Sequence, residues 1–223
     1  MLMNLFSIFD PQVIFFYQIN WFSTLIILFI IPQIYWILSS RIIYLINKFY
    51  SMLWFEFKII LKNNFNNYNL IYLITLFMYI MMNNFMGLFP YIFTSSSHLI
   101  FSMTFSLSLW LSLMMFSLSK NMIFMLAHLV PQGTPFMLMF FMVLIEFLSN
   151  LIRPLTLCIR LTANMIAGHL LLVLLSSFIP VMFSFYQFIL IFQLILLILE
   201  VGVSLIQAYV FVILVTLYLK ETN

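Results

Sequence analysis

Residues 146–169 read EFLSNLIRPLTLCIRLTANMIAGH, and this stretch decides the fold. It contains three charged side chains, Glu146, Arg153 and Arg160, in a chain of 223 residues that has only 8 Lys and Arg and 5 Asp and Glu. Pro154 is its one turn signal. A charge at the centre of a bilayer costs about 2.5–3.5 kcal/mol on insertion scales. Charged residues inside so apolar a segment therefore indicate a functional site.

The composition of the chain is that of a protein embedded in lipid. It is 66% hydrophobic and 6% charged, with a mean hydropathy of +1.22, whereas a soluble domain has about 25% charged residues. The apolar runs are continuous and lack the alternation of a membrane barrel, which leaves spanning helices. We therefore predict an all-α integral membrane protein in which residues 1–223 form a single membrane domain.

The sequence lacks the residues that several classes of protein require for their function. One cysteine excludes a disulfide framework. The sequence has no P-loop, no cluster of metal ligands and no nucleophile–base pair. We expect no cofactor, no metal, no nucleic-acid partner and no catalysis by the chain alone.

About five membrane-embedded helices and one surface helix are expected. Residues 13–38 are a predicted span, and residues 70–118 predict a helical hairpin around a polar loop at 94–97. Residues 41–62 predict a basic amphipathic surface helix, with a soluble loop helix as the alternative. Residues 119–135 are expected to be a loop. On a helical wheel, the polar residues of 41–62 fall within an arc of about 100°: Arg41, Tyr44, Lys48, Ser51, Lys58 and Lys62.

The last part of the chain predicts a hairpin of two unusually long helices over residues 136–219. The apolar run up to about residue 178 has no room for two spans and a loop, so it is expected to be one helix of about 60 Å. That length is twice the bilayer core of roughly 30 Å, so the helix must tilt strongly, and Pro154 is expected to bend it. Pro180 marks the turn, and a second long helix returns over 181–219.

The basic residues predict the orientation. Arg and Lys occur in 41–62, at Lys120 and at Lys220. With five spans, all three regions lie on the same side of the membrane, as the positive-inside rule requires. The N-terminus and the loops near 94–97 and 180 then face the opposite side.

Polar residues form one stripe on each helix of the predicted hairpin. His169 is nine residues after Arg160 and faces another direction. Folding the hairpin near residue 179 predicts Arg160 within about one turn of the depth of Glu200. The first stripe holds Glu146, Asn150, Arg153, Leu157, Arg160 and Asn164, and the second holds Gln193, Glu200, Ser204 and Gln207.

We expect the positive charge of Arg160 to act as a barrier to protons. Arginine stays protonated at every relevant pH, whereas His, Glu and water can relay a proton. A fixed cation between two proton-accessible groups blocks direct passage and attracts a carboxylate of a partner. For Glu146 and Arg153, seven residues apart, a pair that only holds helices together is the alternative. Arg153 could instead extend to the basic side of the membrane.

Four strings closely resemble the mitochondrial ATP synthase subunit a family (ATP synthase F0 subunit 6): IRLTANMIAGHLL at 159–171, EVGVSLIQAYVF at 200–211, GLFPYIFT at 87–94 and LAHLVPQGTP at 126–135. The resemblance covers essentially the whole chain. It implies the proton-translocating stator subunit of the F-type ATP synthase membrane sector, coupling proton flow to rotation and ATP synthesis. Two offset half-channels would serve the carboxylates of a ring of c subunits.

The resemblance also implies roles for six residues. Arg160 matches the arginine that faces the ring and separates the half-channels. His169 and Glu200 match the polar pair of the half-channel open to the intermembrane space, and Glu146 matches the acid near the matrix half-channel. Gln207 matches the glutamine beside the arginine, and Asn164 belongs to the same motif. Arg153 receives no role.

Partners and location follow from the same resemblance. The implied partners are the c-ring, other membrane-sector and peripheral-stalk subunits, protons, and inner-membrane lipid such as cardiolipin. The implied location is the mitochondrial inner membrane, multi-pass, with the N-terminus toward the intermembrane space and the C-terminus toward the matrix.

Two other functions compete with the stator. A self-contained proton-coupled secondary transporter or channel would be expected to show internal repeats and broken helices, and the chain shows no repeat and has only 4 Gly. A purely structural membrane anchor would not need polar residues in two stripes.

Overall fold

A computed structural model of the chain describes residues 6, 9–11, 18–30, 40–61, 67–130, 135–180 and 185–222. Regular structure in these ranges is helical throughout, which confirms the all-α prediction. Four of the helices, α3 to α6, are long and apolar enough to cross a membrane. The main helices are α1 (Ser23–Ile30), α2 (Arg41–Leu61), α3 (Asn67–Gly87), α4 (Leu99–His128), α5 (Phe136–Phe178) and α6 (Tyr186–Thr222), with short 3-10 helices η2 (Ile19–Phe22) and η4 (Ser95–Ser97).

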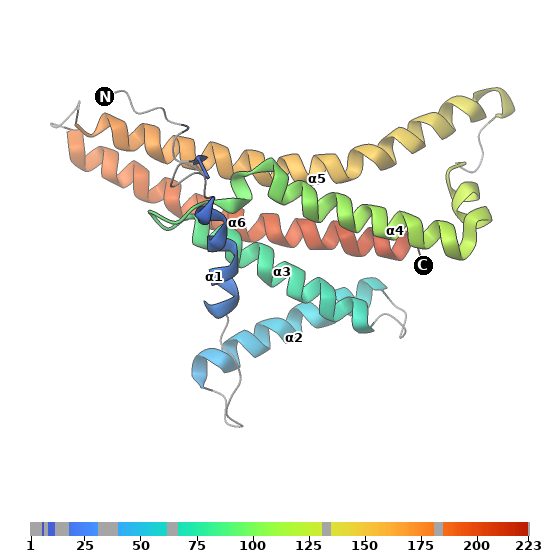
Figure 1. The fold of residues 1–223 in the computed structure, drawn as a ribbon, viewed down its shortest axis with the longest axis horizontal. Helices are drawn as coiled ribbons and strands as arrows, with labels where there is room; N and C mark the ends of the chain where they lie inside the picture. Colours follow the sequence, from blue (N-terminus) through green and yellow to red (C-terminus); the bar gives the residue numbers. More distant parts are fainter. Residues whose placement is uncertain are drawn as a thin grey trace.

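Helices α5 and α6 form the predicted long hairpin. They contain 43 and 37 residues, which correspond to about 65 Å and 55 Å at 1.5 Å per residue. They lie side by side along the longest dimension of the molecule (Figure 1). A bilayer core of roughly 30 Å can hold helices of this length only if they are strongly tilted.

Helix α5 remains one helix in spite of an internal proline. Pro154 lies inside it and is buried. Proline has no N–H for the helical hydrogen bond and its ring crowds the preceding turn, which bends a helix. Figure 1 shows the corresponding bend near the middle of α5.

Helix α4 is longer than the sequence suggested. The prediction of a loop over 119–135 is wrong for residues 119–128, because α4 continues to His128. The helix-breaking residues Pro131 and Gly133 come only after this point, and the residues before them are mostly good helix formers. Lys120 is therefore part of α4.

The predicted first span is described only in part. Within 13–38 the structure describes η2 and α1, an apolar helical segment of 12 residues from Ile19 to Ile30. Residues 12–17 and 31–39 lie outside the described ranges. A span over 13–38, and with it the count of five, stays a prediction.

Helix α2 packs against the transmembrane helices through one face. In Figure 1 it lies beneath α3, and it contacts both α3 and α6. Its basic side chains Arg41, Lys48 and Lys58 are exposed. This arrangement suits an amphipathic helix at a membrane surface. The buried core that α2 joins contains Leu53, Phe57 and Leu61 of α2, Leu73, Phe77 and Ile80 of α3, and Ala208, Phe211 and Val212 of α6.

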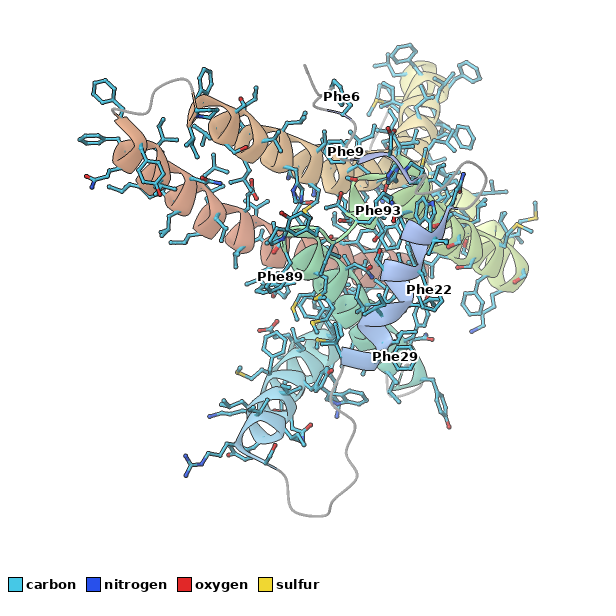
Figure 2. The ribbon with its side chains drawn as sticks, turned by 60° about the vertical axis from the view of Figure 1, so that its left-hand side comes forward. Phe6, Phe9, Phe22, Phe29, Phe89 and Phe93 are labelled. Carbon is cyan, nitrogen blue, oxygen red and sulfur yellow. The ribbon has the colours of Figure 1, made fainter. Side chains whose placement is uncertain are left out.

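Large apolar side chains cover much of the outer surface. Phe22 and Phe29, labelled in Figure 2, are 58% and 83% exposed on the N-terminal helical segment. On α5, Phe140 is 81% exposed. Apolar surface on this scale marks contact with lipid or with other membrane subunits.

Candidate functional site

Arg160 lies on an exposed face of α5, beside α6. It borders a small cavity of about 10 Å³ that both helices line. Within the described ranges its guanidinium forms no ion pair with an acidic side chain. Arginine cannot lose its proton in a protein, so Arg160 presents a permanent positive charge at this face. The cavity is lined by Leu157, Arg160 and Leu161 of α5 and by Gln207, Val210 and Phe211 of α6.

Gln207 is the α6 residue that the structure brings to Arg160. It is buried, with 8% of its surface exposed, and it lines the same cavity. The predicted proximity of these two residues is thus present in the fold. Asn164, one turn after Arg160, is also exposed, so the exposed part of the α5 stripe runs from Arg160 to Asn164.

Glu200 lies directly against the backbone of α5 at Gly168. A Cβ atom placed on Gly168 would be 2.7 Å from Oε1 and 2.9 Å from Cδ of Glu200. Glycine is therefore required for this close approach. Glu200 is 8% exposed, and neither carboxyl oxygen has a hydrogen-bond partner among the described residues.

His169 follows Gly168 and lies in the same region. Its Nε2 atom is buried and has no hydrogen-bond partner among the described residues. The ring of Phe9 meets the imidazole edge-on, with centroids 6.4 Å apart. Phe9 lies close to this part of α5 in Figure 2. His169 and Glu200 are thus neighbours in the hairpin without a direct hydrogen bond to each other.

Arg160 and Glu200 lie further apart along the hairpin than predicted. Arg160 is level with Gln207, whereas Glu200 is level with Gly168, and eight residues of α5 correspond to about 12 Å. The prediction of a separation within one turn is wrong because it placed the turn near residue 179. Helix α5 ends at Phe178 but α6 begins only at Tyr186, which shifts the register.

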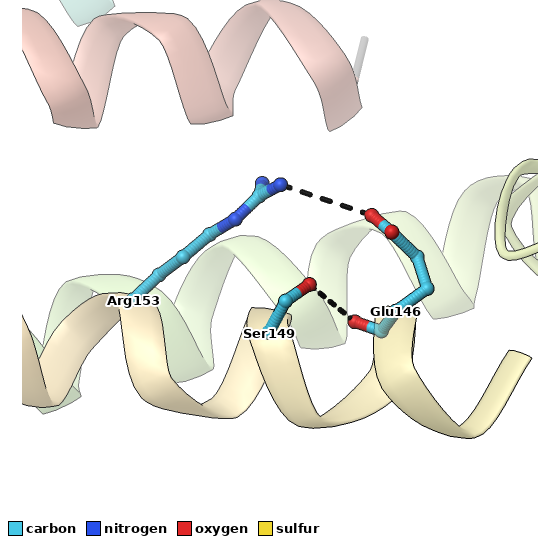
Figure 3. Close-up of polar contacts among 3 residues, drawn as sticks. All are labelled: Glu146, Ser149 and Arg153. Atoms are coloured by element: carbon cyan, nitrogen blue, oxygen red, sulfur yellow. Dashed lines mark hydrogen bonds and ion pairs between the residues drawn. The ribbon is translucent and has the colours of Figure 1, made fainter. Parts of the chain in front are cut away.

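Glu146 and Arg153 form an ion pair on α5 (Figure 3). Nη2 of Arg153 is 3.9 Å from Oε1 of Glu146. The side chains are 32% exposed for Arg153 and 39% for Glu146, so the pair is half-buried. The guanidinium also lies over the ring of Tyr218 of α6, 5.4 Å from its centroid. Arg153 therefore links Glu146 to the end of α6, in agreement with the alternative of a helix-holding pair.

Buried polar side chains of α3 extend the α6 stripe. Asn84 is fully buried, and its amide donates to the backbone carbonyl of Ser204 at 3.5 Å. Ser204 is one turn from Glu200. Asn83, which precedes Asn84 in the sequence, accepts a hydrogen bond from the Ser95 hydroxyl of η4 at 3.3 Å. A polar cluster therefore connects the 94–97 loop with the α6 stripe.

Sequence reasoning missed Asn83 and Asn84. Their signal is two consecutive amides in an apolar spanning run, and polar residues within a membrane segment indicate function. Ser204 was predicted to lie in the α6 stripe, and in the structure it is fully buried. What the sequence could not show is which helix this stripe meets.

The polar groups occupy three levels along α5. Glu146 and Arg153 lie toward its beginning, Arg160 lies in the middle, and His169 with Glu200 lies beyond. From Glu146 to Arg160 is about 21 Å along the helix axis, and from Arg160 to the level of Glu200 about 12 Å. Arg160 thus lies between Glu146 on one side and His169 with Glu200 on the other.

Comparisons with known proteins agree on one family. The sequence model of the family described as ATP synthase A chain matches residues 3–220. The chain is similar to ATP synthase subunit a of Drosophila melanogaster, with 51% identity over 100% of both chains. It is also similar to ATP synthase subunit a of Locusta migratoria, with 53% identity over 99% of both chains. The protein of that name from Aedes albopictus is 51% identical over 100% of both chains.

Proposed function

The chain belongs to the ATP synthase A chain family, and from this premise we propose that Arg160 separates two offset proton half-channels. The family makes the chain a proton-translocating, multi-pass subunit of the ATP synthase membrane sector, associated with other subunits of that complex and not catalytic alone. The observation that carries the proposal is the position of Arg160. It is an exposed cation, has no acidic partner within the described chain, and lies between two proton-exchanging groups.

The first half-channel is formed around Glu200 and His169. Glu200 is buried against Gly168, and its carboxyl oxygens have no hydrogen-bond partner among the described residues. A buried polar group without such a partner is costly, and it persists where function requires it. The cluster of Asn84 and Ser204 continues from Glu200 toward the 94–97 loop. This half-channel opens to the intermembrane space.

The second half-channel lies at the other end of α5. Glu146 is half-exposed there, on the side of Arg160 opposite to Glu200. It serves the exchange of protons with the matrix. Its ion pair with Arg153 orients the carboxylate and limits its motion, which gives Arg153 a positioning role beside the proton route.

A ring of c subunits is the partner that Arg160 requires. The exposed faces of the hairpin combine apolar side chains with the guanidinium of Arg160, which has no acidic partner among the described residues. A ring carboxylate that leaves lipid and meets Arg160 is stabilised in its ionised form, because a nearby opposite charge favours ionisation. Once past Arg160 it can be reprotonated from the other half-channel. Net proton transfer then requires rotation, which is driven by about 2.3 kcal/mol per proton per 100 mV.

The proposed mechanism also implies a membrane, an orientation of the chain in it, and neighbouring subunits. We place the chain in the mitochondrial inner membrane, with its N-terminus toward the intermembrane space and its C-terminus toward the matrix. The basic helix α2 then lies on the matrix face, where positive residues accumulate. Other membrane-sector and peripheral-stalk subunits would cover apolar surface that the c-ring leaves free.

Reconstitution tests this function against that of a self-contained transporter. The purified chain is placed in liposomes alone or together with a c-ring, and proton flux under an imposed potential is measured with a pH-sensitive dye. We expect steady flux only with the ring, because neither half-channel crosses the membrane. Steady flux through the chain alone would overturn the proposal and favour a transporter.

A further inference from the structure

An open groove between α2 and α3 lies outside the proton route. Its volume is about 310 Å³, which is at the lower end of the roughly 300–1,000 Å³ typical of small-molecule sites. The lining is almost entirely apolar. It consists of Tyr50, Ser51 and Trp54 of α2 and Ile71, Ile74 and Thr75 of α3.

The residues of the groove suit one acyl chain at a membrane surface. Ile71 is 52% exposed, whereas Ile74 is 8% exposed and forms part of the buried core. Tyr50 and Trp54 are half-buried on the α2 side. Tyr and Trp are enriched where the bilayer core meets the headgroups, because their rings are apolar and their tips polar. Burial raises the pKa of the Tyr50 phenol, in keeping with its apolar surroundings.

Two exposed lysines of α2 lie next to the residues that line the groove. Lys58 follows Trp54 by one turn and therefore lies on the same face of α2. Lys48 precedes Ser51 by one turn, and the Ser51 hydroxyl donates to its backbone carbonyl at 2.7 Å. Both lysines are exposed. Each such side chain near a membrane surface attracts anionic lipid.

Glu56, the acidic residue of α2, does not lie beside Lys58 and does not neutralise its charge. Glu56 lies on the other side of the helix, where its Oε2 accepts a hydrogen bond from the Tyr209 hydroxyl at 2.9 Å. Residues 56 and 58 are about 200° apart on a helical wheel. The groove thus combines an apolar floor and an aromatic wall with exposed lysines on the adjoining face of α2.

We propose that this groove binds one anionic phospholipid, with an acyl chain against Trp54 and Ile71 and its phosphate facing Lys58. The lipid would fill the space between the surface helix and the first turns of α3, and so hold α2 against the transmembrane helices. The site does not depend on the proton mechanism, because none of its residues borders Arg160, Glu200 or Glu146.

Photo-crosslinking in the assembled complex tests the site. The complex is purified, depleted of lipid, and incubated with phosphatidylglycerol or phosphatidylcholine that carries a diazirine in one acyl chain. Crosslinked peptides are then mapped by mass spectrometry. We expect phosphatidylglycerol to label residues 50–54 and 71–75, and unlabelled phosphatidylglycerol, but not phosphatidylcholine, to compete.

Two variants and one control distinguish the effect of the Lys58 charge on lipid labelling from the effect of the open space in the groove. Lys58→Gln should lower labelling about fivefold, the effect of one surface lysine on anionic lipid. Ile71→Trp should abolish labelling by filling the groove while keeping both lysines. Arg41→Gln removes the same charge from the same helix at a distance from the groove, and labelling should persist.

Three outcomes would overturn the proposal. Equal labelling by the phosphatidylcholine probe would show a groove without selectivity for charge. Labelling unchanged in Lys58→Gln would remove the lysine from the site. No labelling of residues 50–54 and 71–75 by either probe would show that the groove holds no lipid.

Discussion

Replacing Gly168 by alanine perturbs the proposed intermembrane-space half-channel at a single point. The new Cβ atom would lie 2.7 Å from Oε1, 2.9 Å from Cδ and 3.1 Å from Cγ of Glu200. These are side-chain atoms at the flexible end of a glutamate, so the carboxyl group moves and the helix backbone does not need to. The substitution therefore displaces Glu200 and leaves the charges of the site unchanged.

The size of the displacement follows from the contact distances. Ordinary van der Waals contact begins at 3.4 Å, so Oε1 must move by about 0.7 Å. Misplacement of a reacting group by 1 Å can reduce a rate by about 100-fold. We expect Gly168→Ala to lower the rate of proton translocation by roughly tenfold. The fold should tolerate the change, because alanine has a higher helix propensity than glycine by about 1 kcal/mol.

The assay compares Gly168→Ala with Gly202→Ala in membrane vesicles that contain the assembled complex. Gly202 is also a helical glycine, on α6 two residues after Glu200, and an added Cβ there would meet nothing within 4 Å. ATP synthesis driven by an imposed proton gradient gives the rate, and thermal dissociation of the complex gives stability. Gly202→Ala should retain the rate of the natural chain.

Wild-type rates in Gly168→Ala would refute the assigned role of the Gly168–Glu200 contact. An equal loss of rate in both variants would point to a general intolerance of these helices instead. Loss of assembly in Gly168→Ala alone would mean that the contact supports packing rather than proton transfer.

Three further substitutions test separate parts of the structure. Glu146→Gln should change stability by less than about 1 kcal/mol, because a half-exposed pair contributes little, while ATP synthesis slows; proportional losses of stability and synthesis would identify a purely structural pair. Tyr209→Phe removes the hydrogen bond to Glu56 and should cost roughly 0.5–1.5 kcal/mol, seen as a lower temperature of thermal dissociation; an unchanged temperature would contradict this. Asn84→Leu should assemble but conduct fewer protons, since it removes the buried amide that donates to Ser204; normal flux would exclude Asn84 from the half-channel.

Local patterns along the chain were sufficient to predict most of the helices. The bounds of α5 were predicted almost to the residue, because Pro135 precedes it and Pro180 follows it. The placement of Glu200, Ser204 and Gln207 on one face of α6 followed from helical periodicity alone. These features depend on residues a few positions apart, so no knowledge of tertiary packing was needed.

Two features could be obtained only from the structure: the alignment of α5 with α6, and the identity of the helix that each polar stripe contacts. The depth of Glu200 relative to Arg160 depends on where the connection between the helices begins and ends, and apolar runs on both sides of Pro180 leave that open. The end of α4 was predicted too early because Lys120 was taken as the edge of a span. The contact of Asn84 with α6 joins residues 120 positions apart, which no local pattern encodes.

Arg160→Ala in the assembled complex tests the central claim most directly. Proton conductance and ATP synthesis are measured in the same vesicles under the same imposed gradient. Without the fixed cation, ring carboxylates could exchange protons with both half-channels without a full rotation. We predict that ATP synthesis is lost while protons still cross passively. Retained synthesis, coupled to proton flow as in the natural chain, would contradict the role of Arg160 as the barrier between the half-channels.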